Sequence, residues 1–185
     1  MARIFRRYKS TIYGNYRKAY IIAGVLTGVA MAIILLLRDW LSASPMPSPE
    51  NYVTEVILAL GIFLACILYR NDLPDKKVTL KELMLLGLGI GVVSAIVYGL
   101  WIWLNLSVLS PDLVEYYNEE RISMMEPAET SVAAKLAVEQ VRRYTAGNWA
   151  FIGGFRSAVM SIIITFFAAL ILRTEKGEVR TNNKN

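Results

Sequence analysis

The stretch Leu83–Leu104, LMLLGLGIGVVSAIVYGLWIWL, runs for 22 residues without a charged side chain. At a rise of about 1.5 Å per residue, a helix of this length crosses the roughly 30 Å hydrocarbon core of a bilayer. Small residues recur in it at every fourth position, namely Gly87, Gly91, Ala95 and Gly99. Residues four apart stack on one face of a helix, so a second helix backbone can approach closely along this face. The stretch therefore predicts a transmembrane helix in a tightly packed bundle.

The composition places the whole chain in the membrane class. Of its 185 residues 55% are apolar, and they occur in long blocks, whereas a soluble domain would intersperse them with polar positions. The net charge of +5 lies beside these blocks, so anionic lipid headgroups are the expected partners and nucleic acid is not. The sequence has no histidine and one cysteine, Cys66. These counts exclude an intrachain disulfide, a zinc cluster and histidine-based catalysis, and we expect no cofactor or metal.

Three further apolar runs complete an all-α, polytopic membrane protein with four transmembrane helices. The predicted helices cover residues 19–37, 52–69, 83–104 and 149–172 and form a single domain, residues 19–172. The first follows a basic segment, residues 1–18, an arrangement that is also typical of a secretory signal peptide. Its apolar core is longer than the roughly 7–15 residues of a signal peptide, and the small residues after it lead into Pro45. We therefore expect a retained helix.

Small residues at four-residue spacing recur on the first and last of these helices. They are Gly24, Gly28 and Ala32 on the first, and Gly153, Ser157, Ser161, Thr165 and Ala169 on the last. The ladder on the last helix is as regular as that on the third, so we expect these two helices to face each other. Such faces either hold one bundle together or form a seam with a partner, and we favour packing within the chain.

Residues 105–148 form the only sizeable polar region between predicted spans. Ser110 followed by Pro111 is typical of a helix start, and the helix should stop before Pro127. Its expected apolar face comprises Leu113, Val114, Tyr117, Arg121 and Met124 or Met125. A second helical run carries Ala133, Leu136, Ala137, Val141 and Tyr144 on one face. The pattern predicts an extracytoplasmic amphipathic hairpin over residues 110–145, which rests on the membrane surface or caps the bundle.

Basic residues in the flanking segments predict the orientation, because such segments stay cytoplasmic. The N-terminal segment has six, residues 70–82 have four, and the tail, residues 173–185, has four. By contrast, the link after the first helix has only Arg38, and residues 105–148 hold seven acidic residues against four basic ones. Both termini should therefore be cytoplasmic, with their basic segments at anionic lipid headgroups, and the hairpin should lie outside.

Arg156 is the most anomalous residue, because an ionisable side chain inside a transmembrane helix is costly and often functional. Glu55 lies in the first turn of the second helix, which runs in the same direction as the fourth. Their nominal difference in depth is about 6 Å, which an arginine side chain can bridge. We expect an ion pair between Arg156 and Glu55. Alternatively, a lipid phosphate accepts the hydrogen bonds of Arg156. A third hypothesis is that the two side chains extend separately to the headgroups.

With these features in view, the chain resembles the family of bacterial four-helix membrane proteins catalogued as domain of unknown function 4199. The resemblance extends roughly from Tyr20 to Leu172. Its most specific part, Val78–Tyr117, contains a Thr-Leu-Lys-Glu lead-in, the glycine-rich third helix and the run Ser-Pro-Asp-Leu-Val-Glu-Tyr-Tyr. The resemblance implies an inner-membrane protein without an assigned activity, and it supplies no catalytic residues.

Three classes of function remain open. The leading hypothesis is a non-enzymatic scaffold or accessory subunit of a larger membrane complex or lipid-linked enzyme, with a membrane protein or a second copy as partner. The alternative is lipid-phosphate binding or transport through Arg156, although the spans have no midplane acidic relay and no helix broken by proline. An enzyme is the weakest reading, because the carboxylates cluster in the hairpin and no nucleophile lies beside a recognisable base.

Overall fold

The computed structural model describes residues 16–41, 52–73, 78–125 and 132–174. Its elements are α2 (Tyr16–Leu41), α3 (Tyr52–Asp72), α4 (Leu80–Leu104), the π-helix η1 (Asn105–Leu109), α5 (Leu113–Met125), α6 (Val132–Arg142) and α7 (Ala146–Leu172). Within these ranges α2, α3, α4 together with η1, and α7 are long and apolar enough to cross a membrane, which confirms the predicted fold class. Most of the N-terminal basic segment, the link with Pro45, Pro47 and Pro49, the stop at Pro127 and most of the tail lie outside the described residues.

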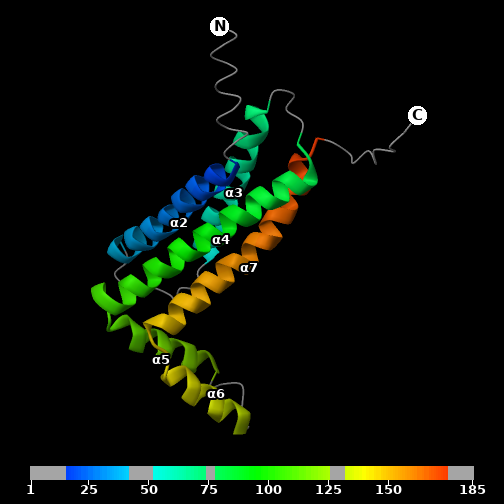
Figure 1. Cartoon of the computed structure of the whole chain (residues 1–185). Helices are drawn as coiled ribbons and strands as arrows, with labels where there is room; N and C mark the ends of the chain where they lie inside the picture. The colour runs from blue at the N-terminus through cyan, green and yellow to red at the C-terminus, as the bar shows by residue number, and fades with distance from the viewer. Residues whose placement is uncertain (1–15, 42–51, 74–77, 126–131, 175–185) are drawn as a thin grey trace, which may run out of the picture.

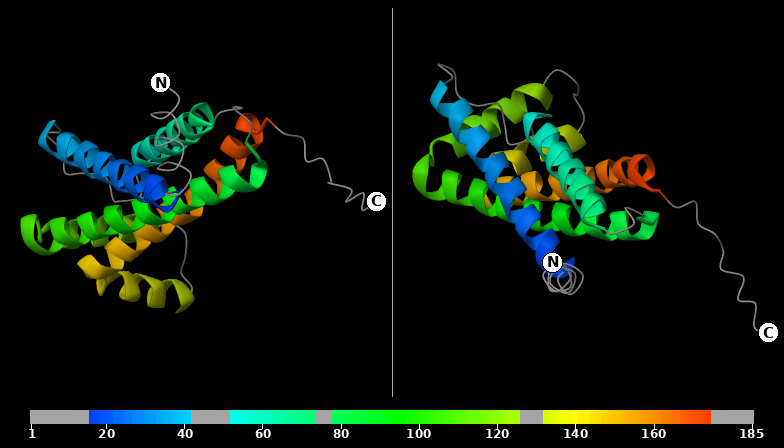
Figure 2. Two further views of the ribbon diagram at one scale, coloured as in Figure 1. Left: turned by 45° about the horizontal axis from the view of Figure 1, so that its top comes forward. Right: turned by 90° about the horizontal axis from the view of Figure 1, so that it is seen from above.

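Among the four long helices, α4 contacts α2, α7 and α3, and α3 also contacts α7 and α2. Figure 1 shows α4 and α7 side by side, and Figure 2 shows α2 and α3 together on one side of that pair. The shorter helices α5 and α6 lie beyond the end of the bundle at which α4 ends and α7 begins (Figure 1). This end is called the α5 end below.

Side-chain caps fix where the two central helices begin. At α4 the Glu82 backbone N–H donates to Thr79 Oγ1 at 3.3 Å, and the Thr79 N–H donates to Glu82 Oε2 at 2.9 Å, so the Thr-Leu-Lys-Glu run forms a capping box. At α7 the Thr145 N–H donates to Asn148 Oδ1 at 2.9 Å. Asparagine takes the place of the usual Glu or Gln in this second box. Because Thr145 is the N-cap, α7 begins at Ala146, before the predicted start at Trp149.

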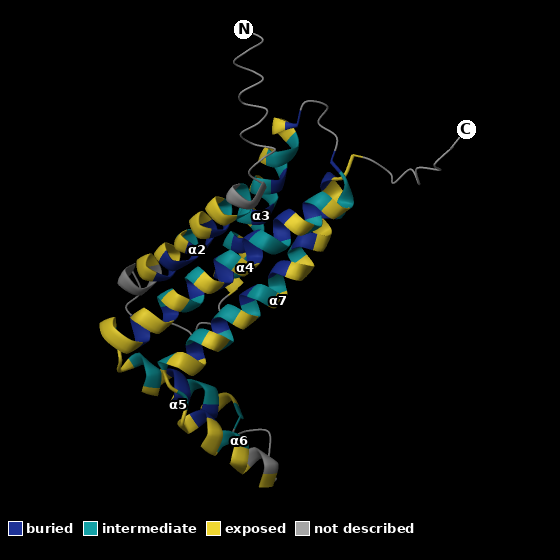
Figure 3. Cartoon of the chain, in the orientation of Figure 1, coloured by how far each residue is buried: buried dark blue, intermediate teal, exposed yellow. Residues whose placement is uncertain are grey.

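The outward faces of the bundle are as apolar as its core. On α3, Leu58, Ile62 and Cys66 are fully buried, whereas Leu60 and Leu64 on the opposite face are exposed. Figure 3 shows such exposed positions along the outer sides of the long helices. Exposure of this surface to water would be unfavourable, whereas lipid tails are as apolar as leucine side chains. The pattern therefore fits helices in a bilayer.

The ladders on α4 and α7 face each other in the antiparallel sense. A Cβ atom built at Gly87 would lie 2.5 Å from Thr165 Cγ2, and one built at Gly91 would overlap Ser161. Nearer the α5 end, a Cβ at Gly154 would lie 3.2 Å from the Ala95 carbonyl oxygen. Glycine is therefore required at Gly87 and Gly91, because the facing side chains of Thr165 and Ser161 leave no room for a Cβ on α4.

The small residues of α2 pack against a different face of α4. A Cβ at Gly24 would lie 2.6 Å from Val93 Cβ, and one at Gly28 would lie 2.7 Å from Val97 Cβ. The close approach lets the Ser94 hydroxyl donate to the Gly24 carbonyl oxygen at 2.9 Å. These small-residue faces thus pack helices of the same chain against each other, which is the hypothesis favoured from the sequence.

The hairpin differs from the prediction in where its first helix begins and in which side chains are buried. α5 begins at Leu113, because Ser110 and Pro111 form a turn whose carbonyl groups accept from the N–H groups three residues later. Its buried residues include Asn118 and Ile122, whereas Met124 is exposed. In α6, which carries the predicted second apolar face, Val141 is buried and Leu136 is 63% exposed. The contact of Asn118 with α7, described below, determines which face of α5 is buried.

Candidate functional site

Glu55 and Arg156, the two ionisable residues singled out in the spans, meet between α3 and α7. The Arg156 Nε and Nη2 groups both donate to Glu55 Oε1, at 2.7 and 2.6 Å. The Glu55 side chain is 13% exposed and that of Arg156 is 29% exposed. The geometry is that of a direct ion pair at the edge of the bundle, rather than of two side chains that reach the headgroups separately.

Aromatic side chains lie next to this pair. The Arg156 guanidinium lies over the Tyr52 ring, 5.3 Å from its centroid, which is a cation–π contact. The fully buried Tyr98 of α4 forms a side-chain hydrogen bond with Thr54 and lies within electrostatic range of both charges. These five residues, Tyr52, Thr54, Glu55, Tyr98 and Arg156, are called the ion-pair cluster below, and they join three of the long helices.

The charges of the ion-pair cluster can serve helix pairing or the binding of an anion. A charge inside the bilayer is costly unless it is paired, and the pair supplies each partner with an opposite charge. A guanidinium that is partly open to the surroundings can also bind a phosphate oxygen. Among the residues that the structure describes, no group of three or more metal-binding side chains gathers here or elsewhere.

A second polar contact fixes the hairpin to the bundle. The buried Trp149 at the start of α7 donates its indole N–H to Asn118 Oδ1 at 2.9 Å. The Asn118 amide donates in turn to the Tyr144 carbonyl oxygen at 3.1 Å. The rings of Tyr117 and Tyr144 meet Trp149 edge-on, with centroids 5.7 and 5.9 Å away. The hydrogen bonds and ring contacts hold α5 and α6 in one orientation relative to α7.

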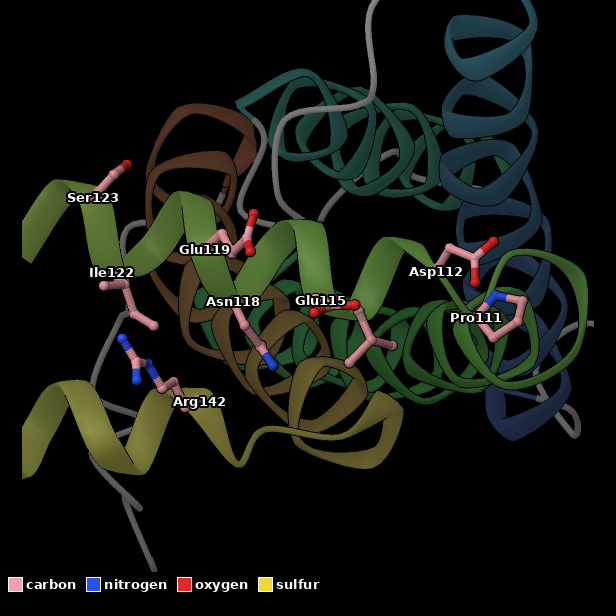
Figure 4. Close-up of a pocket in the computed structure, with 9 residues that line it drawn as sticks. Pro111, Asp112, Glu115, Asn118, Glu119, Ile122, Ser123 and Arg142 are labelled. Carbon is pink, nitrogen blue, oxygen red and sulfur yellow. The ribbon is translucent and has the colours of Figure 1, made fainter.

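A pocket of about 740 Å³ opens between α5 and α6. Figure 4 shows Asp112 in the turn before α5, Glu115 and Glu119 on α5, and Arg142 reaching from α6 toward Ile122. Within the described part of the chain, none of these four charged side chains forms an ion pair or a side-chain hydrogen bond. The side of the pocket formed by Asp112 and α5 is therefore an acidic surface.

The structure separates the residues singled out from the sequence into three places. Glu55 and Arg156 come together, and Gly87 and Gly91 of α4 face Thr165 and Ser161 of α7, with Ser157 and Ser161 buried. Nearer the α5 end, Gly154 rather than the predicted Gly153 faces Ala95 and Gly99. Gly24 and Gly28 lie at the α2–α4 interface instead. The sequence interpretation missed the Trp149–Asn118 contact, whose only signal was a tryptophan directly after a polar stretch.

Comparison with known proteins gives one result. The model of the family described as "Protein of unknown function (DUF4199)" matches residues 21–174. No curated protein matches, and no solved structure does. The chain belongs to the DUF4199 family, the family that the Val78–Tyr117 block resembles.

Proposed function

We propose that this DUF4199 protein is a non-enzymatic accessory subunit that presents its α5–α6 unit to a larger membrane protein or lipid-linked enzyme. The observation that carries the proposal is the buried Trp149–Asn118 contact, which holds α5 and α6 beyond the end of the bundle. A scaffold needs such a fixed surface, because ordering a mobile segment on binding would reduce the affinity.

The chemistry of the presented surface indicates the chemistry of the partner. Asp112, just before α5, and Glu115 and Glu119 on α5 follow one another at three- and four-residue spacing, and they form no ion pairs among the described residues. A basic extramembrane segment of the partner complements these charges and would be steered toward them. We therefore propose a membrane protein with such a segment as the partner.

Neutralising the acidic wall should weaken the complex without unfolding the protein. The test variant combines Asp112→Asn, Glu115→Gln and Glu119→Gln, and the matched control is Glu139→Gln on the exposed side of α6. Each variant is cross-linked in native membranes and purified in mild detergent. The triple variant should capture at least about tenfold less of the partner than the wild type, because it loses several charge contacts. The control, whose exposed pair with Arg143 contributes little, should retain the partner. Equal capture by both variants would contradict the proposal, and capture of a second copy alone would identify a homo-oligomer.

The proposed location is the bacterial inner membrane, with both termini in the cytoplasm. The support is the distribution of basic residues between the loops. Single cysteines introduced at Lys184 and at Glu119, with Cys66 replaced by alanine, should react with impermeant maleimide from opposite sides. Reaction of both cysteines from the same side would contradict the topology.

A second candidate function is binding of a lipid phosphate at Arg156. The observation that favours it is the 29% exposure of the Arg156 side chain inside a candidate span, where a headgroup phosphate can approach. A phosphate would then compete with Glu55 for the guanidinium. The charge-deletion experiment in the Discussion separates this function from a purely structural ion pair.

A further inference from the structure

One groove on the outside of the bundle remains open to the membrane. It has a volume of about 470 Å³, and almost no polar surface lines it. Its floor lies where Gly99 of α4 meets Gly154 of α7, and a Cβ built at Gly99 would be 3.8 Å from the Gly154 Cα. The backbones themselves thus form the floor. The walls are the large side chains Ile96, Leu100 and Trp103 on α4, and Phe151 and Phe155 on α7.

The length and position of the groove indicate what fills it. Its lining on α4 extends from Val92 to Trp103, which is about 16 Å of helix, and its lining on α7 extends from Gly147 to Ala158. That length is about half of the roughly 30 Å hydrocarbon core. The groove therefore covers one leaflet, from the α5 end to the middle of the bilayer. A lipid tail also occupies one leaflet, so the length of the groove matches that of a tail.

We propose that this groove is a binding site for one hydrocarbon tail of a diacyl lipid from the leaflet at the α5 end. Trp103, which suits the headgroup level, marks the mouth of the groove, and the tail end lies near Val92 and Ala158. A tail in the groove contacts protein on its floor and both walls, whereas a tail on a convex helix face contacts protein on one side only. The additional dispersion contacts distinguish this tail from bulk lipid. The site does not depend on the proposed accessory role.

The wall on α7 offers a variant that should not disturb folding. The Phe151 and Phe155 rings stack at 5.7 Å and are 70% and 60% exposed, so they contribute little to the core. Phe166 and Phe167 are an adjacent pair on the same helix, 47% and 55% exposed, and they lie outside the groove. The double change Phe151→Ala with Phe155→Ala removes one wall. The double change Phe166→Ala with Phe167→Ala is the matched control.

Photo-cross-linking in vesicles tests the proposal. The full-length protein is reconstituted in phosphatidylethanolamine and phosphatidylglycerol that contain a diacyl phosphatidylcholine with a diazirine at the end of one tail. Peptide mass spectrometry should find the label concentrated near Val92 and Ala158, and well above the label on the exposed Leu60 and Leu64 of α3. A diazirine near the ester end should move the label toward Trp103.

The variants give the deciding comparison. The variant without Phe151 and Phe155 should lose most of the groove label, and the control variant should keep it. Equal labelling of the groove and of α3, or equal labelling of the two variants, would overturn the proposal. Cross-linking of a second polypeptide through the groove in place of lipid would also overturn it and would identify a helix as the occupant.

Discussion

Gly91→Leu is expected to destabilise the bundle by about 3 kcal/mol or more, at the upper end of the range for over-packed cores. A Cβ at Gly91 would overlap both the Oγ and the Cβ of Ser161. Rotation about χ1 moves the hydroxyl but not the Cβ, so α4 and α7 would have to separate. Separation would also weaken the neighbouring contact of Gly87 with Thr165. The measurement is the free energy of unfolding in mixed micelles of dodecyl maltoside and SDS.

Gly147→Leu is the matched control for this substitution. A Cβ there would meet only the Thr145 Oγ1, at 3.6 Å, which is an ordinary contact. Leucine also has a higher helix propensity than glycine, so the change in unfolding free energy should stay within about 0.5 kcal/mol. If both substitutions were tolerated equally, the α4–α7 ladder would not be a close-packed interface.

The sequence predicted the packing of α4 against α7 because small residues at four-residue spacing have one physical meaning in a membrane helix. Gly87 and Gly91 could only allow close approach, and the equally regular ladder with Ser161 was the matching surface. The Glu55–Arg156 contact was predictable for a similar reason, since few other charges lay at that depth. In both cases the residue pattern left few alternative partners.

The contacts that the sequence did not reveal depend on tertiary geometry. Asn118 looked like any solvated residue of a polar helix until the position of Trp149 determined which face of α5 is buried. Tyr98 looked like one more apolar position of α4, although it hydrogen-bonds to Thr54 beside the ion pair. The groove between α4 and α7 depends on which part of the ladder remains uncovered, and no periodicity encodes that property.

Arg156→Leu is expected to destabilise the protein by about 2–3 kcal/mol, because it leaves the Glu55 carboxylate without its partner inside a candidate span. This value is below the range of about 3–5 kcal/mol for fully buried pairs, since the partial exposure of Arg156 screens the interaction. Arg156→Lys keeps the charge but cannot reproduce the two bonds to Glu55 Oε1, so an intermediate loss is expected.

The double change Glu55→Leu with Arg156→Leu should be at least about 1 kcal/mol more stable than Arg156→Leu alone, because an isolated charge in the bilayer is worse than none. The cycle of wild type, two single variants and the double variant is measured by unfolding in detergent and again in lipid-containing bicelles. Additive losses in both media would show that the contact contributes no coupling energy. A loss on Arg156→Leu that occurs only with lipid would identify phosphate as the partner of the guanidinium. Recovery in detergent alone would instead show that Glu55 is sufficient, and that the ion-pair cluster holds α3 against α7 without a lipid headgroup.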